Sequence, residues 1–386
     1  MSGRLLLVGV STRAAAESAA RAGFTVTAID AFGDLDQHQA VRGLSMGRDF
    51  DASFTPGAVA RAAASLPCDA VAYLSNFENH PRAVSKLAAG RELWGNSPAV
   101  LRRVRDPRQL RDALAEGGFP TPRVLVGLEP SSGTRYVMKP VASRGGHRVR
   151  DWQAGMAVPR RSYLQEFVDG MPASIVFVAA GGRGVPLGLS RQLVGEAALG
   201  SAGYRYCGSI LAGAGDGQFD RDEELTARAC RLASVVTAAF SLVGVNGIDF
   251  VARGGVPYVV EVNPRWSASM ELVERACGLS VFGVHADACR SGILPEFDLA
   301  SARKGLAAVG KAIVFARREV VVGDTRQWLG DSTIRDVPQP GERIRAGGPV
   351  CTVFAEAPDA AGCHAALAAQ AKRVYERLAT WGRSVA

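Results

Sequence analysis

The segment Val245–Arg265 (VNGIDFVARGGVPYVVEVNPR) brings two carboxylates toward each other. Two apolar strands flank a Gly-Gly pair, which is the signature of a β-hairpin. With the turn centred on Gly255, Asp249 lies directly opposite Glu261, and Asn263 follows on the same face. Opposed Cβ atoms in a hairpin are about 4.5–5.5 Å apart. The pattern therefore predicts two acids and one amide gathered on one face.

Two carboxylates this close repel each other in strands as apolar as IDF and YVVEV, so the pair costs stability unless a cation lies between them. A set of two carboxylates and one carboxamide offers only oxygen ligands. Such a set suits Mg²⁺, or Mn²⁺, which takes its remaining ligands from water and phosphates. A turn one residue shorter is the alternative. It would put the two acids on opposite faces, with one of them merely solvated.

A second candidate site lies in Tyr136–Val149 (YVMKPVASRGGHRV), where a strand delivers Lys139 shortly before a Ser-Arg-Gly-Gly loop. Glycines allow successive backbone N–H groups to point into one concavity that binds phosphate oxygens. Lysine adds a compact positive charge for the same phosphates. The alternative is a hairpin turn with a lysine whose ammonium reaches solvent. A P-loop is excluded, because GxxxxGK[ST] occurs nowhere in the chain.

The composition of the chain singles out this lysine. The 386 residues include 45 basic side chains, but only five of these are lysine. Because the chain uses arginine for nearly every positive charge, a lysine inside an apolar strand is less easily a surface accident. The five lysines are Lys86, Lys139, Lys304, Lys311 and Lys372.

The elements that must position these groups alternate in type along the chain. In residues 1–96, continuous apolar strands alternate with helices, which predicts a parallel, doubly wound sheet. Residues 97–122 are typical of a helical linker, with Pro107 interrupting it. Residues 123–168 predict a small α+β unit around the glycine loop, and residues 169–303 a larger one. Residues 304–386 predict β-rich segments and a final helix. The expected fold class is thus α/β plus α+β.

Composition excludes several classes of protein. Hydrophobic residues make up 47% of the chain and charged residues 21%, which argues against disorder. No apolar run is long enough for a membrane-spanning helix. The net charge of +8 raises the question of nucleic acid, but the arginines are scattered among acids and no nucleic-acid-binding motif occurs. Seven cysteines without a CxxC pair favour a reducing cytoplasm over a disulfide framework.

Together these segments resemble the ATP-grasp superfamily over most of the chain. Their order is similar to that family's plan: a Rossmann-like N-terminal domain, a small lid with a lysine and a glycine loop, and a larger metal-binding lobe. The KP lysine, the hinge-like YLQEFVDG and an acid followed twelve positions later by EVNPR carry the resemblance. From GKAIVFAR onward the chain looks like the β-rich C-terminal cap of the biotin carboxylase branch.

The resemblance implies a ligand contact for each matched residue. The expected contacts are Lys139, Ser143, Gly145 and Gly146 with the ATP phosphates, Gln165, Glu166 and Val168 with the adenine, and Asp249, Glu261 and Asn263 with Mg²⁺. Arg265 would face the reacting phosphoryl or acyl group, and Lys139 and Arg265 are the expected catalytic residues.

The chain departs from the family pattern in its linker. Many members carry a lysine there, whereas this chain has Pro107 and Arg108, so the sequence leaves open whether Arg108 reaches a phosphate. Polar residues after a parallel strand are placed for substrate contacts, which makes Glu78 a candidate. Arg191, on a strand, and Arg205, in a glycine-rich loop, are further substrate candidates.

The expected function is that of an ATP- and Mg²⁺-dependent ligase, which activates a carboxylate as an acyl phosphate and couples it to an amine. Ligases with this resemblance serve amino-acid conjugation and cofactor biosynthesis, and a homodimer is usual among them. One alternative is a carboxylase that phosphorylates bicarbonate. Another is a non-catalytic nucleotide- or nucleic-acid-binding protein, which would bind DNA or RNA with a steep salt dependence.

The assignment of the phosphate and metal sites predicts that Lys139→Ala and Glu261→Ala each abolish ATP turnover, because each removes a charge that holds the nucleotide. ADP release measures the loss, and circular dichroism verifies the fold. Near-normal turnover in either folded variant would contradict the assignment.

Overall fold

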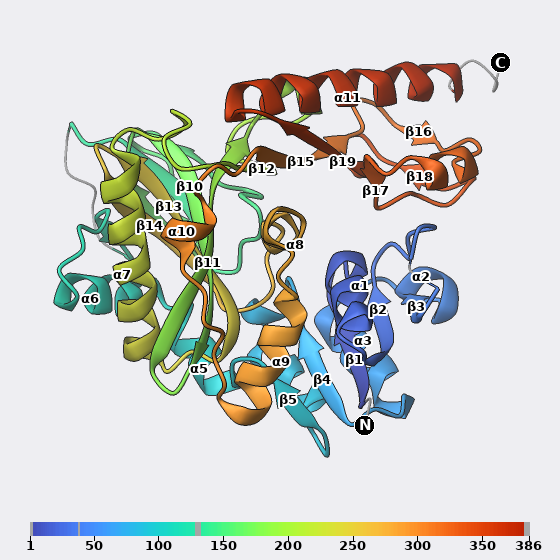
Figure 1. Cartoon of the computed structure of the whole chain (residues 1–386), viewed down its shortest axis with the longest axis horizontal. Helices are drawn as coiled ribbons and strands as arrows, with labels where there is room; N and C mark the ends of the chain where they lie inside the picture. Colours follow the sequence, from blue (N-terminus) through green and yellow to red (C-terminus); the bar gives the residue numbers. More distant parts are fainter. Residues whose placement is uncertain (1–2, 38, 128–132, 382–386) are drawn as a thin grey trace.

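The computed structural model describes residues 3–37, 39–127 and 133–381. Its N-terminal part is a five-stranded parallel sheet in the order β3-β2-β1-β4-β5, which confirms the doubly wound prediction (Figure 1). The strands are β1 Arg4–Val8, β2 Thr25–Asp30, β3 Val41–Ser45, β4 Ala70–Tyr73 and β5 Glu92–Trp94. The helices of this part are α1 Arg13–Arg21, α2 Met46–Asp49, α3 Pro56–Ala62 and α4 Pro81–Leu87.

Two helices, α5 Pro98–Val104 and α6 Pro107–Glu116, form the linker. Asp106 separates them: its carboxylate accepts hydrogen bonds from the backbone N–H groups of Arg108 and Gln109 and so caps α6. Pro107 stands in the first turn, where its missing N–H costs nothing. The proline therefore begins the second helix, α6, and the linker is two separate helices and not one.

A small antiparallel sheet with the order β6-β9-β7-β8 follows. Its strands are β6 Val124–Leu125, β7 Tyr136–Pro140, β8 Arg150–Trp152 and β9 Ser162–Glu166. Tyr136, Met138 and Leu164 form its own small core. Lys139 lies in β7, and the glycine loop connects β7 to β8.

The largest element is an eight-stranded sheet with the order β14-β13-β10-β11-β12-β15-β19-β17. Because β15, β19 and β17 continue the sheet begun by β10, the C-terminal segments are part of the central sheet and not a separate β layer (Figure 1). The strands are β10 Met171–Ala180, β11 Arg183–Val194, β12 Tyr206–Leu211, β13 Gly244–Arg253, β14 Val256–Asn263, β15 Ala308–Phe315, β17 Ile334–Arg335 and β19 Pro349–Ala357, and a separate pair is β16 Val320–Val321 with β18 Arg343–Ile344.

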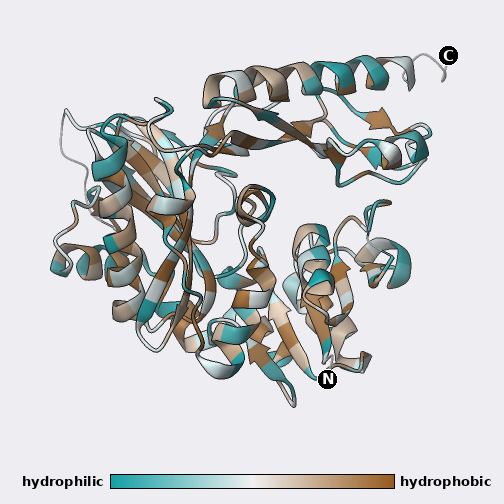
Figure 2. Ribbon diagram, in the orientation of Figure 1, coloured by the Kyte–Doolittle hydropathy of each residue, from teal (hydrophilic) through white to brown (hydrophobic). Residues whose placement is uncertain are grey.

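Helices cover this sheet and join it to the N-terminal part. They are α7 Asp222–Phe240, α8 Met270–Cys277, α9 Val281–Ser291, α10 Leu299–Ala302 and α11 Ala360–Trp381. Phe282 of α9 belongs to a hydrophobic cluster that includes Leu5 of β1 and Val176 of β10, so α9 seals the two sheets together. The strands are coloured as predominantly hydrophobic in Figure 2. None of the helices described is long and apolar enough to cross a membrane.

The turn of the β13–β14 hairpin is one residue shorter than predicted. Arg253 pairs with Val256, so the turn contains two residues, as in the alternative that would separate the two acids. A β-bulge at Val260 then adds one residue to β14 and shifts the register. As a result Asp249 lies opposite Glu261 after all.

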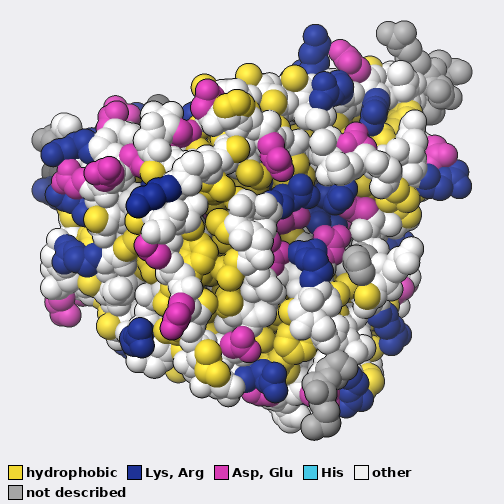
Figure 3. All heavy atoms as spheres, in the orientation of Figure 1, with side chains coloured by type: hydrophobic (Ala, Val, Ile, Leu, Met, Phe, Trp, Pro, Cys, Tyr) yellow, Lys and Arg dark blue, Asp and Glu magenta, His cyan; other side chains and the backbone are white. Residues whose placement is uncertain are grey.

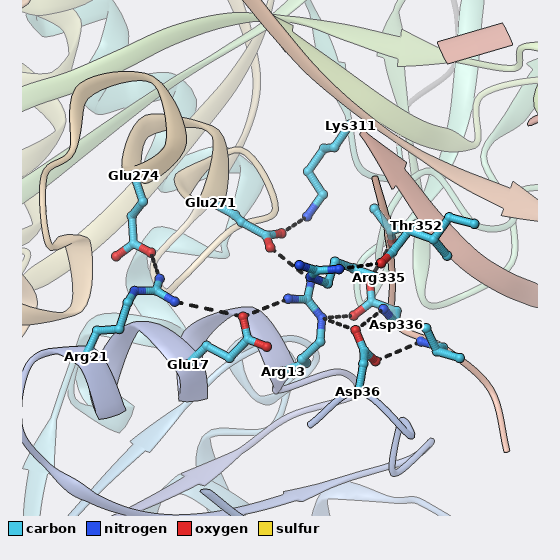
Figure 4. A network of polar contacts seen from close by, with 12 residues as sticks. Arg13, Glu17, Arg21, Asp36, Glu271, Glu274, Lys311, Arg335, Asp336 and Thr352 are labelled. Carbon is cyan, nitrogen blue, oxygen red and sulfur yellow. Dashed lines mark hydrogen bonds and ion pairs between the residues drawn. The ribbon is translucent and has the colours of Figure 1, made fainter. Parts of the chain in front are cut away.

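Charged side chains of both signs gather where α1 and the C-terminal strands meet (Figure 3). At the centre is Arg13 of α1, which is 0% exposed. Its guanidinium donates to Asp336 at 2.7 Å, to Glu271 of α8 at 3.0 Å and to Glu17 at 3.1 Å (Figure 4). Burial opposes the charge of Arg13, but the three carboxylates outweigh it and hold its pKa well above the usual range. Arg13 thus ties three parts of the chain together.

Replacing Arg13 by methionine would remove the cation that these carboxylates share. Lys311 would still pair with Glu271 and Arg21 with Glu17, but Asp336 would lose its ion pair. We expect the free energy of unfolding of Arg13→Met to fall by about 3–5 kcal/mol in urea denaturation. Arg4→Met is the matched control, because Arg4 pairs with Asp69 while the two side chains are 55% and 54% exposed. A loss in Arg13→Met no larger than that in Arg4→Met would refute the role of Arg13.

Candidate functional site

A cavity of about 430 Å³ opens between the small sheet and the eight-stranded sheet and reaches α1 and β15. Most of the residues expected from the sequence lie on its walls. These are Lys139, Ser143, Gly145, Gly146, Gln165, Glu166, Val168, Asp249, Glu261, Asn263 and Arg265.

The acid pair of the β13–β14 hairpin is held by hydrogen bonds on both sides. Asn263 donates to Asp249 Oδ2 at 2.8 Å, and Gln192 of β11 donates to Asp249 Oδ1 at 2.9 Å. Arg105, at the end of α5, lies 3.2 Å from Glu261 Oε2. Each acid therefore has an amide or a cation beside it.

The pKa values of the two acids move apart. Burial raises the pKa of Asp249 to about 6, and the Glu261 carboxylate adds to the rise. Burial opposes the charge of Glu261 too, but Arg105 and Lys139 outweigh it and hold the pKa of Glu261 below its usual range. A divalent cation between the two would relieve the repulsion that raises the pKa of Asp249.

The donor set fits Mg²⁺. Two carboxylates and the Asn263 amide supply oxygen ligands from neighbouring strands. In the part of the chain that the structure describes, no three His, Cys, Asp or Glu side chains form a metal-binding group. A cation held here would therefore depend on water and phosphate for its other ligands, as Mg²⁺ commonly does.

Lys139 is 7% exposed, and its ammonium donates to Gln165 Oε1 at 3.1 Å and to the Val260 carbonyl at 3.0 Å. Val260 is the extra residue of the β-bulge, and such a residue is left out of the strand ladder. The bulge thus does two things: it turns Glu261 toward Asp249, and it presents a carbonyl to the lysine.

The glycine loop is docked against neighbouring segments. The Tyr206 N–H donates to the Gly145 carbonyl at 3.1 Å, and Asn79 donates to the Ser143 carbonyl at 3.1 Å. Gly146 has a φ of +71°, and a Cβ atom at this position would come within 1.8 Å of the Tyr204 carbonyl oxygen. Only glycine fits there, because the backbone of the loop approaches another backbone directly.

The expected hinge follows β9. The Glu166 carboxylate accepts a hydrogen bond from the Arg123 N–H at 3.1 Å, and the Phe167 N–H donates to the Arg135 carbonyl at 2.8 Å. The Arg135 guanidinium also lies 3.7 Å from the centroid of the Phe167 ring. These contacts fix the segment that leads from the small sheet into β10.

Arg265 and Glu78 form a buried ion pair of 2.7 Å, and Glu78 is 1% exposed. Among the described residues, Nε of Arg265 and Oε2 of Glu78 are buried without a hydrogen-bond partner. Arg265 also donates to Asn263 Oδ1 at 3.0 Å. Arg265 lines the cavity while Glu78 lies behind it, so Glu78 orients the arginine and is not itself in the wall.

Arg105, and not Arg108, is the linker arginine that reaches the site. Arg108 is exposed, and its guanidinium donates to the Val126 carbonyl at 3.2 Å. Arg105 donates to Glu261 at 3.2 Å, to the Val262 carbonyl at 3.0 Å and to Asn79 Oδ1 at 3.1–3.2 Å. Arg105 ends the helix α5 one residue before the cap of α6, which aims it back toward β14.

The other two substrate candidates lie outside the cavity wall. Gln192 lines the cavity, and successive strand residues point to opposite faces, so Arg191 faces away. Arg205 donates to the Gly347 carbonyl at 2.7 Å and stacks 3.6 Å from the centroid of the Phe315 ring, so it joins the β11–β12 loop to the C-terminal strands. The sequence analysis did not single out Gln192 or Arg105. The face on which a strand residue lies depends on where the strand begins and how it pairs, and the direction of Arg105 depends on where the helix α5 ends.

Residues 104–269 match the family model described as an ATP-grasp domain. The fold is similar to the L-amino acid ligase of Bacillus licheniformis (17% identity, 94% of this chain and 96% of that one, TM-score 0.67). It is also similar to the carboxyaminoimidazole ribonucleotide synthase of Aspergillus clavatus in complex with ATP (16%, 98% and 99%, TM-score 0.69). A third similar structure is the biotin carboxylase of Campylobacter jejuni (13%, 93% and 89%, TM-score 0.68).

A curated relative, an uncharacterised protein of Methanocaldococcus jannaschii, is 26% identical over 121 residues. The match spans 31% of this chain and 28% of that relative. These comparisons support the fold and the nucleotide-binding region, whereas the substrates have to be argued from the site.

The two linker arginines give a matched test. Arg105→Met removes the hydrogen bonds that hold the Glu261 carboxylate and the Val262 carbonyl in place, so we expect Mg-ATP to bind roughly 10- to 100-fold more weakly. Arg108→Met removes an exposed arginine and is expected to change the dissociation constant less than about twofold. Isothermal titration calorimetry measures both. Equal affinity in the two variants would contradict the placement of Arg105 in the site.

Proposed function

We propose that this protein, whose residues 104–269 match the ATP-grasp domain model, is an ATP- and Mg²⁺-dependent ligase that couples a small-molecule carboxylate to an amine and releases ADP and phosphate. The observation that carries the proposal is the single cavity that joins the acid pair, Lys139 and Arg265. A homodimer in the cytoplasm is part of the same proposal.

In the first step, an oxygen of the substrate carboxylate attacks the γ-phosphorus of ATP, and the bond to the bridging oxygen breaks to give an acyl phosphate and ADP. Lys139 and the backbone N–H groups of the glycine loop would bind the phosphates and hold them in line. Mg²⁺, held by Asp249, Glu261 and Asn263, would neutralise charge on the phosphate oxygens.

In the second step, the amine nitrogen attacks the acyl carbon, the bond from that carbon to the phosphate oxygen breaks, and the amine proton leaves with the phosphate. Negative charge develops on the acyl oxygen, and Arg265 is suited to bind it because its guanidinium lines the cavity. The ion pair with Glu78 keeps Arg265 in place and keeps it charged. Catalysis then depends on positioning and charge, and needs no protein nucleophile.

The bicarbonate-phosphorylating alternative has support in the similarity to biotin carboxylase. No Met-Lys-Met biotinyl-acceptor motif occurs in the chain, so the acceptor would be a separate molecule. Coverage does not separate the two functions, because the carboxyaminoimidazole ribonucleotide synthase is covered more fully, at 99%, than either the L-amino acid ligase or the biotin carboxylase. We place the ligase first because the chain carries no biotinyl-acceptor motif of its own.

A panel of carboxylates, amines and bicarbonate, offered with Mg-ATP, tests the proposal. We expect ADP release to require one carboxylate and one amine together, with a product whose mass equals their sum minus water. Folded Lys139→Met serves as the inactive control. ADP release that requires bicarbonate alone would favour the carboxylase. If no combination releases ADP, both the ligase and the carboxylase are contradicted, and a non-catalytic nucleotide-binding protein is the proposal that remains.

A further inference from the structure

A row of polar side chains runs across the face of the eight-stranded sheet, from the acid pair to the C-terminal strands. Each member lines the cavity, and each stands on the strand next to the one before it or at a position paired with it. The row consists of Glu261 and Asp249 on β14 and β13, Ser174 on β10, Gln192 on β11, Ser209 on β12, Lys311 on β15 and Thr352 on β19.

Lys311 is the positive charge in this row. It pairs with Ser209 in the strand ladder, and it is 5% exposed although it lines the cavity. Of the five lysines in the chain, Lys139 and Lys311 are buried and the other three are exposed. Both buried lysines therefore face the same cavity, from two different sheets. In a chain that otherwise uses arginine, this placement indicates a need for a compact ammonium at each end.

Lys311 lies too far from Asp249 and Glu261 to contact a nucleotide phosphate that binds beside them. Four strand spacings separate β13 from β15, which is roughly 19 Å along the sheet at about 4.8 Å per strand. In the proposed reaction, the nucleotide phosphates bind at the acid pair, and the acyl group and the incoming amine lie successively farther along the row toward Lys311. The group that reaches Lys311 therefore belongs to the remote end of the amine substrate.

The surroundings of Lys311 select the kind of anion. Its ammonium donates to Glu271 Oε2 at 2.5 Å, and lysine has three donors. Glu271 shares its other oxygen with Arg13, and Asp336 also lines the cavity (Figure 4). The ion pairs of the network join three cations, Arg13, Arg21 and Lys311, to five acids, which are Glu17, Asp36, Glu271, Glu274 and Asp336.

Because carboxylates outnumber cations here, a phosphate dianion would meet an excess of negative charge, whereas a carboxylate adds a single charge. The network also explains how Lys311 is held, since Arg13 fixes Glu271 and Glu271 fixes the ammonium.

We propose that Lys311 binds a free carboxylate on the amine substrate, so that the amine coupled by this enzyme is that of an amino acid and not a plain amine. This inference rests on the proposed ligase function. In this proposal the two buried lysines bind different groups in one cavity: Lys139 binds the nucleotide phosphates, and Lys311 binds the carboxylate of the acceptor.

The test compares acceptors that differ only in this carboxylate. The ADP-release assay is run with the twenty L-amino acids as acceptors and with their α-carboxamides. We expect the wild-type protein to use at least one free acid with a KM roughly 10- to 100-fold lower than that of its α-carboxamide. Equal KM values for acid and amide would overturn the proposal while leaving the ligase function intact.

Variants then assign the preference to Lys311. In Lys311→Met, the KM for the free acid rises to that of the amide, while the KM values for ATP and for the amide stay unchanged. A merely structural lysine would move all three KM values or none. Lys304→Met is the matched control, because Lys304 is exposed, and it is expected to keep the preference.

Three further outcomes complete the test. Lys311→Arg keeps the charge and the ion pair with Glu271, so it is expected to retain part of the acid preference even if Lys311→Met does not fold. A preference that survives in folded Lys311→Met overturns the proposal. No ADP release with any carboxylate and acceptor overturns the proposed function, and the inference with it.

Discussion

The repulsion between Asp249 and Glu261 is the constraint on which the site depends. Two acids opposed in an apolar hairpin need positive charge near them, and the chain supplies it from three directions. Arg105 comes from the linker, Lys139 from the small sheet and Arg265 from the end of β14. The linker, the small sheet and the eight-stranded sheet therefore each place a cation near the same two acids, Asp249 and Glu261. Mg²⁺ and the nucleotide phosphates would enter a site that is already organised around charge.

Much of this could be predicted from the sequence, because the strongest signals are local. Alternating apolar strands and helices gave the parallel sheet, and the KP lysine with its glycines and the EVNPR strand gave the ATP-grasp fold. The opposition of Asp249 and Glu261 was predicted with a turn of the wrong length, and the bulge at Val260 compensates for that. A bulge has no clear signature in one sequence, since the extra residue is an ordinary valine. The pairing was thus right for a reason that only the register reveals.

The residues that could not be predicted depend on contacts between distant segments. Arg191 and Gln192 are neighbours, and strand parity alone decides that the glutamine reaches Asp249. Arg105 and Arg108 are three residues apart, and the helix break at Asp106 decides which one reaches β14. Lys311 did carry a signal. The scarcity of lysine that singled out Lys139 applies equally to a lysine within the apolar segment GKAIVFAR.

The continuity of the eight-stranded sheet also limits how this chain can be divided. In the sheet order, β12 is followed by β15, although more than ninety residues separate the two strands in sequence. A protein shortened to end before β15 would leave β12 as an edge strand, with a row of unpaired N–H and C=O groups. Such an edge is a template for pairing with other chains and hence for aggregation. The C-terminal segment therefore keeps the central sheet soluble as well as closing the far end of its cavity.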